Sequence, residues 1–143
     1  MGTTTELITG TPEATEDAAA RLGRRLGPGD LVLLVGELGA GKTTFVRGLA
    51  RGMGVEGPVV SPTFQLVRVY RGPVTLAHVD LYRLGDGADL ADLDLDGLLD
   101  GGAVAVEWGD RLDPAADALR VVIEPVDPGR RRLTLEGPPR WSW

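Results

Sequence analysis

The sequence predicts an α/β fold with a mainly parallel central sheet, and three observations lead to this prediction. Leu31–Val35 is a continuous apolar run, which is typical of a strand buried on both faces of a sheet. A glycine-rich loop follows this run, and apolar residues then recur between Lys42 and Met53 at the spacing of a helix. Ala103–Val106 is a second short apolar run. Buried strands that are separated by a helix are the elements of a parallel α/β sheet.

The length and composition are those of one globular domain spanning residues 1–143. A chain of 143 residues can bury one core but is too short for two ordinary domains. The chain has no cysteine, which excludes disulfides, thiolate metal sites and a cysteine nucleophile. Its net charge of −6 disfavours binding to nucleic acid through bulk attraction. Because no apolar run could span a bilayer and no basic, apolar leader is present, we expect a cytoplasmic protein without membrane contact.

Two elements are predicted before the first apolar run. Glu6–Ile8 is predicted to be a short opening strand. Between Glu13 and Leu26, apolar residues recur every four positions, as at Ala18 and Leu22, which predicts an amphipathic helix. Glycine and proline directly after Leu26 are expected to end this helix.

The remaining elements follow the same patterns. Gln65–Tyr70 and Val74–Leu81 are predicted to be strands, and the short link between them permits only an antiparallel hairpin, expected as an insertion. Asp89–Leu99 is predicted to be a helix. Leu119–Ile123 and Arg131–Leu135 are predicted to form a closing pair of strands.

The loop after the first buried strand carries a motif. Gly36–Thr43 reads Gly-Glu-Leu-Gly-Ala-Gly-Lys-Thr, the pattern of a phosphate-binding loop. Its glycines let backbone N–H groups converge on phosphate oxygens, and the start of the next helix adds further donors. Lys42, the only lysine of the chain, is expected to be an exposed loop residue that reaches the terminal phosphates. The candidate nucleotide-binding residues here are Glu37, Leu38, Gly39, Ala40, Gly41, Lys42, Thr43 and Thr44.

This motif and its flanking elements predict a three-layer fold of the P-loop NTPase type. The alternative is a glycine-rich turn between strand and helix that binds nothing. A magnesium ion accompanies the phosphates in such sites and needs oxygen ligands. The hydroxyl of Thr43 is one candidate ligand, and Glu107, directly after the second apolar run, is another. The alternative for Glu107 is an exposed glutamate at a strand end.

Two further polar residues are candidates near the phosphates. Thr63, in Ser61–Phe64, is a candidate to present its hydroxyl to magnesium, and Asp80 is a candidate to orient or deprotonate the attacking water. By local pattern alone, each is equally consistent with a turn cap or a polar residue at a strand edge. His78, the only histidine, is expected to be a hydrogen-bonded structural residue.

Four segments occur in a fixed order along the chain: Gly36–Phe45, Ser61–Phe64, the run His-Val-Asp-Leu-Tyr-Arg from His78, and Glu107–Trp108. Together they resemble the TsaE family of small bacterial ATPases. The resemblance implies ATP and Mg²⁺ as cofactors and a role in making threonylcarbamoyladenosine next to the tRNA anticodon. It also implies docking on a TsaB–TsaD complex, with tRNA only an indirect partner.

The same resemblance implies roles for individual residues. Lys42 and Asp80 are the expected catalytic residues, with Lys42 on the phosphates. Thr43 and Glu107 are expected to hold magnesium. Glu13–Thr15 resembles the opening helix of the family, which lies near the nucleotide. The other expected nucleotide contacts are Thr63 in a switch-like segment, Trp108 beside the metal, and Arg130.

Slow, magnesium-dependent ATP hydrolysis is the function that these patterns favour. Gln65, the only glutamine, is not suitably placed to position a water molecule, so we expect weak activity alone and a partner that completes the site. The alternatives are a small-molecule kinase and a non-catalytic binding module gated by nucleotide. A guanine-specific GTPase is disfavoured, because its usual Asn-Lys-x-Asp base reader cannot exist in a chain without asparagine.

Overall fold

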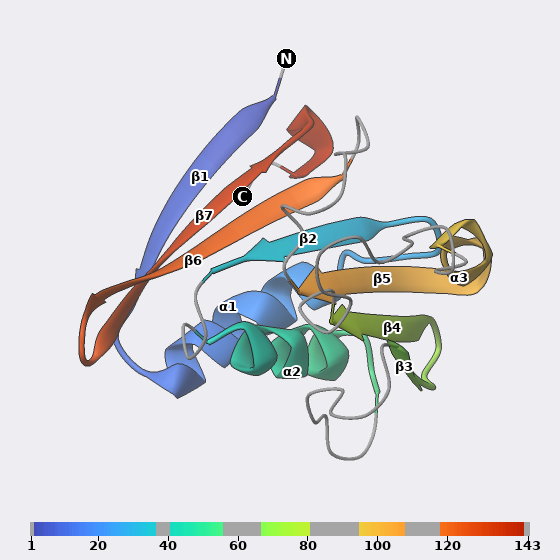
Figure 1. Ribbon diagram of the computed structural model, residues 1–143, viewed down its shortest axis with the longest axis horizontal. Coiled ribbons are helices and arrows are strands. Elements are labelled where there is room, and N and C mark those ends of the chain that lie inside the picture. Colours follow the sequence, from blue (N-terminus) through green and yellow to red (C-terminus); the bar gives the residue numbers. More distant parts are fainter. Residues whose placement is uncertain (1, 37–40, 56–66, 81–94, 108–117, 142–143) are drawn as a thin grey trace, which may run out of the picture.

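The computed structural model describes residues 2–36, 41–55, 67–80, 95–107 and 118–141. Within these ranges, seven strands form one mixed sheet on which helices pack (Figure 1). The strands are β1 (Thr3–Thr9), β2 (Leu31–Val35), β3 (Val67–Tyr70), β4 (Thr75–Asp80), β5 (Gly102–Glu107), β6 (Leu119–Asp127) and β7 (Arg130–Gly137). The helices are α1 (Pro12–Gly23), α2 (Lys42–Gly52) and α3 (Leu95–Gly101), followed by the 3-10 turn η4 (Pro139–Trp141). None of the described helices is long and apolar enough to cross a membrane.

The strand order is β1-β7-β6-β2-β5-β4-β3. The central strands β6, β2, β5 and β4 are parallel neighbours, and the antiparallel pairs lie toward the two edges. The predicted α/β fold, with a parallel centre and an antiparallel hairpin, is therefore confirmed. One detail differs, because β4 pairs with β5 as well as with β3 and is buried on both faces from Leu76 onward. The hairpin thus extends the central sheet and is not an insertion beside it.

The N-terminal strand β1 forms one edge of the sheet, antiparallel to β7 (Figure 1). Its register runs from Thr3 opposite Gly137 to Thr9 opposite Arg131. The strand is longer than the predicted Glu6–Ile8, because its threonine-rich start pairs through the backbone and has no apolar pattern to announce it. This pairing brings the start of α1 close to the turn between β6 and β7.

Local signals explain where α1 begins and ends. The Thr11 hydroxyl oxygen accepts a hydrogen bond from the Ala14 N–H at 3.0 Å, and Pro12 occupies the first helical position. The helix ends at Gly23 and not at the predicted Leu26. The reason is that the chain tightens there into a turn, in which the Leu26 N–H donates to the Gly23 carbonyl at 3.2 Å.

The helices α1 and α2 lie side by side against one face of the sheet (Figure 1). They start at the same end, since Gly48 packs on Glu16 and Gly52 packs on Ala20. A Cβ atom at Gly48 would lie 2.2 Å from the Glu16 carbonyl oxygen, so this approach requires glycine. Arg51 adds an ion pair across the seam, with Nη1 at 3.4 Å from Glu16 Oε1. The first turns of the two helices are thereby held next to each other.

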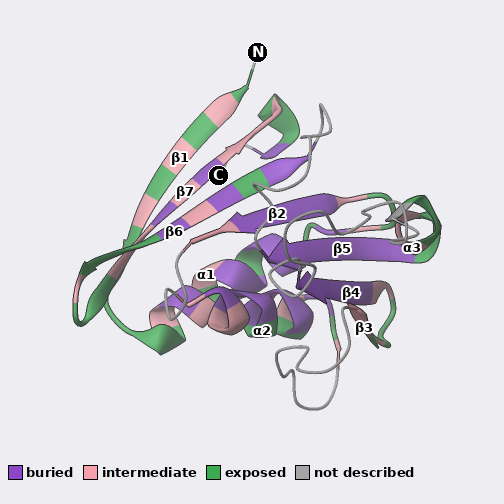
Figure 2. Ribbon diagram, in the orientation of Figure 1, coloured by how far each residue is buried: buried purple, intermediate pink, exposed green. Residues whose placement is uncertain are grey.

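Side chains alternate between the two faces of each central strand. One face meets α1 and α2 and includes Val32 and Leu34 of β2. The opposite face includes Leu33 and Val106 and meets α3 through Leu98. Figure 2 shows β2, β4 and β5 as largely buried strands. This alternation decides which polar residues at the strand ends face α2.

The C-terminal half adds two findings. The predicted helix Asp89–Leu99 corresponds to α3, which continues to Gly101; residues 89–94 lie outside the described ranges. Trp141, in a tail from which the sequence predicts nothing, is only 2% exposed. Its ring packs under the Arg140 guanidinium, 4.2 Å from the ring centroid, and Arg140 Nη2 lies 3.0 Å from Asp30 Oδ1. The tail therefore anchors on the turn that precedes β2.

Candidate nucleotide-binding site

The candidate site lies where the parallel central strands end (Figure 1). β2 ends at Val35, β4 at Asp80 and β5 at Glu107, and α2 begins at Lys42. In open α/β sheets, ligands bind in the crevice outside the carboxyl ends of the strands. The described residues that the sequence assigns to catalysis and metal binding are therefore gathered at this edge.

The start of α2 has the features of an anion-binding helix terminus. Gly41, its N-cap residue, has a φ angle of +110°, a conformation that favours glycine, and provides no side-chain cap. The first turn of α2 also has no acidic residue. By contrast, α1 is capped by Thr11 and has Glu13 in its first turn. The amide donors and the positive dipole end of α2 are thus not neutralised by its own first turn, which suits a bound anion.

Lys42 is buried, with 5% of its surface exposed. The expectation of an exposed loop lysine is therefore wrong, because Lys42 is the first residue of a helix that packs on the sheet. Its Nζ donates a hydrogen bond to the carbonyl oxygen of Gly36. This bond joins the two described ends of the phosphate-binding loop.

Asp80 and Glu107 are register partners on β4 and β5, and they are only 8% and 5% exposed. On its other side, β5 pairs with β2, where Leu34 is the register partner of Glu107. Leu34 packs on the sheet face that meets α1 and α2. Because register partners share a face, both carboxylates are on the α2 side of the sheet. The alternative of an exposed glutamate at position 107 is excluded.

His78 lies two residues before Asp80 on the same face of β4 and is completely buried. Its Nε2 atom is 2.5 Å from Glu107 Oε2. Among the described residues, its Nδ1 atom has no hydrogen-bond partner. The expectation of a hydrogen-bonded histidine is confirmed, and its partner, Glu107, is a candidate metal ligand.

The residues present fit a magnesium ion. Mg²⁺ prefers oxygen ligands and is usually held by one or two carboxylates together with substrate phosphates. Glu107 and Asp80 offer buried carboxylates, and the half-buried Thr43 is in the first turn of the helix that covers their face. The described residues contain no cluster of three or more His, Asp or Glu side chains that could hold a metal without other ligands.

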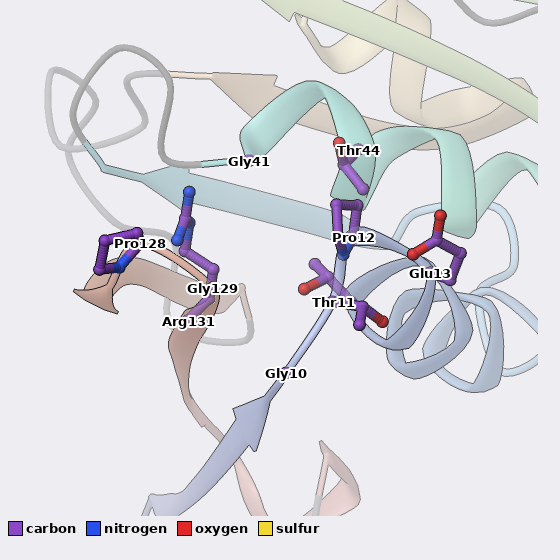
Figure 3. Close-up of a pocket in the computed structure, with 10 residues that line it drawn as sticks. Gly10, Thr11, Pro12, Glu13, Gly41, Thr44, Pro128, Gly129 and Arg131 are labelled. Carbon is purple, nitrogen blue, oxygen red and sulfur yellow. The ribbon is translucent and has the colours of Figure 1, made fainter.

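A cavity of about 360 Å³ lies beside the start of α2 (Figure 3). Three segments far apart in the sequence line it: the start of α1, the start of α2 and the turn between β6 and β7. The Thr15 hydroxyl on its wall lies 2.6 Å from the Thr9 hydroxyl at the end of β1. The residues that line the cavity include Thr11, Glu13, Gly41, Thr44, Gly129 and Arg131.

Two neighbouring arginines at the start of β7 have different roles. Arg130 donates from Nε to Asp127 Oδ2 at 2.6 Å, and this hydrogen bond is the main cause that lowers the pKa of Asp127 below its usual value. Arg130 is therefore held on the turn and does not line the cavity. Arg131 does line it (Figure 3), and its Nη1 also donates to the backbone carbonyl oxygens of Asp127 at 3.3 Å and Arg130 at 3.0 Å. The sequence reasoning did not select Arg131. It could have been found from its spacing, because it lies two residues before the buried Leu133 and so shares that residue's face of β7.

Several predicted site residues lie outside the described residues. They are Glu37, Leu38, Gly39, Ala40, Thr63 and Trp108. Among the described ones, Gly41 and Thr44 line the cavity, and Asp80 and Glu107 lie together at the ends of β4 and β5. Lys42 and Thr43 follow Gly41 in the first turn of α2 and precede Thr44.

This fold and this loop motif, with a buried parallel strand leading into a helix that has no side-chain cap, define the P-loop class of α/β proteins. The family model described as "Threonylcarbamoyl adenosine biosynthesis protein TsaE" matches residues 9–133. The chain belongs to the TsaE family.

Individual relatives agree with this assignment. The tRNA threonylcarbamoyladenosine biosynthesis protein TsaE of Mycobacterium tuberculosis is 41% identical in a match that covers 92% of this chain and 82% of that protein. The TsaE protein of Streptomyces coelicolor is 55% identical over 95 residues, and this match spans 63% of this chain and just 64% of that protein. The crystal structure of Bacillus subtilis YdiB has a TM-score of 0.80 and 32% identity, covering 96% of this chain and 87% of that one.

Proposed function

We propose that this protein binds ATP with Mg²⁺ at the carboxyl ends of β2, β4 and β5 and hydrolyses it slowly in support of threonylcarbamoyladenosine modification of tRNA. Membership of the TsaE family supports the role in tRNA modification. One arrangement carries the proposal for ATP: the start of α2, with the only lysine of the chain, covers the sheet face on which Asp80 and Glu107 end their strands.

The phosphates are held by backbone amides and by Lys42. The N–H groups at the start of α2 supply donors and a positive dipole end. Nζ of Lys42 donates to the carbonyl oxygen of Gly36, so it lies beside the first residue of the same loop. We expect it to exchange this carbonyl for phosphate oxygens, because a charged donor bonds an anion more strongly than a neutral acceptor.

Thr43 and Glu107 are the residues that would hold the magnesium ion. When bound, this ion neutralises charge on the phosphates during transfer of the terminal group. Asp80 is the register partner of Glu107, and we assign to it the orientation or deprotonation of the attacking water. Its burial at 8% exposure fits a carboxylate that acts inside a closed site.

The nucleoside would occupy the cavity beside the start of α2. Its volume of about 360 Å³ is in the range of small-molecule sites, and Gly41 and Thr44 connect it to the phosphate-binding end of α2. Arg131 provides hydrogen-bond donors and a flat cation at this cavity. The proposed nucleotide contacts thus gain Arg131, whereas Arg130 does not line this cavity and binds the Asp127 carboxylate.

The partner in this proposal is the TsaB–TsaD complex of the same modification pathway, acting in the cytoplasm, with tRNA reached only through that complex. A chain with a single glutamine at position 65 has few side chains that could position water, and a stabilising cation is expected from the partner. Hydrolysis by the isolated protein should therefore be slow.

The test is a phosphate-release assay with Mg-ATP, with and without purified TsaB–TsaD complex. We expect slow release alone and a rise of at least about tenfold with the complex, since a supplied transition-state cation is worth more than this in related enzymes. Fast hydrolysis that ignores the complex would contradict the proposal. Transfer of the phosphate to a metabolite, and not to water, would indicate a small-molecule kinase. If a non-hydrolysable ATP analogue supported tRNA modification fully over repeated cycles, the protein would be a binding module.

A further inference from the structure

We propose that His78 is a positioning residue for Glu107: its Nε2 atom holds one carboxylate oxygen so that the other is presented to the metal ion. This inference rests on the proposed function, because it assigns to Glu107 the role of a magnesium ligand. His78 itself is not proposed to touch the metal or the nucleotide.

The geometry places the imidazole and the carboxylate together in the sheet. His78 on β4 is the register partner of Ala105 on β5, and Glu107 follows Ala105 on the same face of that strand. Ala105 has a side chain of a single carbon, which leaves room for the ring to extend across β5. The ring reaches Glu107 with an Nε2 to Oε2 distance of 2.5 Å.

The surroundings make this contact a strong constraint. His78 has no exposed surface and the side chain of Glu107 is 6% exposed, so water does not compete freely for either group. In its proposed role as a metal ligand, Glu107 is a carboxylate, which accepts hydrogen bonds and does not donate them, so Nε2 is the donor in this proposal. The bond fixes the rotation of the carboxylate and uses Oε2, so that Oε1 is the oxygen left for a metal ion or its water.

A purely structural role for the pair is the competing interpretation. A buried hydrogen bond between adjacent strands would stabilise the sheet whether or not Glu107 binds a metal. The two interpretations differ in what happens when the hydrogen-bond donor at position 78 is moved away from Glu107. If His78 positions Glu107, the affinity for the metal ion falls while the affinity for metal-free nucleotide stays the same. If the pair is only structural, the affinity for the metal ion does not change. Hydrogen-bond partners of metal ligands typically alter metal affinity by about 10–100-fold.

The experiment uses two substitutions that differ in where they place an amide donor. His78→Gln puts its amide nitrogen at the distance of Nε2, whereas His78→Asn is one carbon shorter and cannot reach Glu107. Mn²⁺ binding to the complex with the non-hydrolysable analogue AMP-PNP is measured by electron paramagnetic resonance. Binding of AMP-PNP in EDTA and the thermal midpoint of unfolding are measured on the same samples.

We expect His78→Asn to weaken Mn²⁺ binding by about tenfold and His78→Gln to stay within about threefold of the unsubstituted protein. AMP-PNP binding in EDTA should be the same in all three. On a Glu107→Gln background, His78→Asn should have little further effect on Mn²⁺, because the two residues act as one unit. Leu76→Val, on the same face of β4, is the matched control that lowers stability without changing Mn²⁺ binding.

Two results would overturn the inference: unchanged Mn²⁺ binding in a folded His78→Asn protein, or equal losses in His78→Asn and His78→Gln. Either would leave the proposed function intact. Failure of the unsubstituted protein to bind AMP-PNP would instead remove the proposed function, so the two failures are distinguishable.

Discussion

Asp80 and Glu107 are register partners at the last positions of β4 and β5, and both carboxylates are buried on the sheet face that α2 covers. Buried carboxylates at neighbouring positions are favourable ligands for a divalent cation, whose charge offsets theirs. The pair therefore connects the fold to the proposed chemistry: it places carboxylate oxygens on the α2 side of the sheet, where phosphates would bind at the helix start.

Glu107→Gln should weaken the metal dependence of nucleotide binding. The amide keeps the shape of the side chain but has lost its charge, so we expect the Mg²⁺ concentration for half-maximal enhancement to rise by about tenfold. ATP affinity in EDTA should change little. Titration calorimetry at a series of Mg²⁺ concentrations measures both, with Glu124→Gln on the exposed part of β6 as the control. An unchanged metal response would make Glu107 a structural residue.

Lys42→Ala should fold but lose productive nucleotide binding. Lys42 is buried and donates to Gly36, so we expect a loss of about 1–2 kcal/mol in the free energy of unfolding, which leaves the fold intact. Lys42→Arg keeps the charge, but its planar head should not replace the ammonium group. Thermal melting and ATP binding are measured together. Unfolding of Lys42→Ala at ambient temperature, or ATP affinity equal to that of the unsubstituted protein, would contradict the assignment.

Arg131→Ala and Arg130→Ala form a matched pair at the start of β7. Both arginines bind the turn, Arg130 through the Asp127 carboxylate and Arg131 through backbone carbonyls, but of the two Arg131 is the one that lines the cavity. Loss of hydrogen bonds to a charged donor costs about 1.5–3 kcal/mol, so Arg131→Ala should weaken ATP binding by about tenfold or more. Arg130→Ala should change it by less than about threefold. The reverse order of the two affinities would place the nucleoside elsewhere.

Gly48→Ala should destabilise the protein strongly for a change of one methyl group. The new Cβ would lie 2.2 Å from the Glu16 carbonyl oxygen and 2.6 Å from the Ala19 Cβ, so α1 and α2 must separate. We expect a loss of about 1–3 kcal/mol in chemical denaturation. Gly27→Ala, where nothing lies within 4 Å of the added atom, should stay within about 0.5 kcal/mol. Equal stabilities would show that the helices can move apart at little cost.

The parts of the site that lie close together in the sequence could be predicted from it. Gly41, Lys42 and Thr43 form a local motif between an apolar strand and an amphipathic helix, and both elements are present in the structure. The short link before Thr75 predicted the β3–β4 hairpin, which the structure also contains. Glu107 was found because it directly follows an apolar run.

Relations across the sheet could not be predicted in this way. Nothing local indicates that β1 pairs with β7, which brings Thr11 and Arg131 to one cavity. The contact between His78 and Glu107 depends on the register of β4 and β5, and a shift by one residue would separate the two side chains. The burial of Lys42 likewise depends on how α2 packs on the sheet.

The most direct test of this account is titration calorimetry of the unsubstituted protein with ATP at millimolar concentration, with Mg²⁺ and with EDTA. We expect saturable heat with Mg-ATP, weaker binding in EDTA and no comparable signal for Lys42→Ala. Absence of heat with ATP and with every other purine nucleoside triphosphate would contradict the claim that the start of α2 and the buried carboxylates form a nucleotide site.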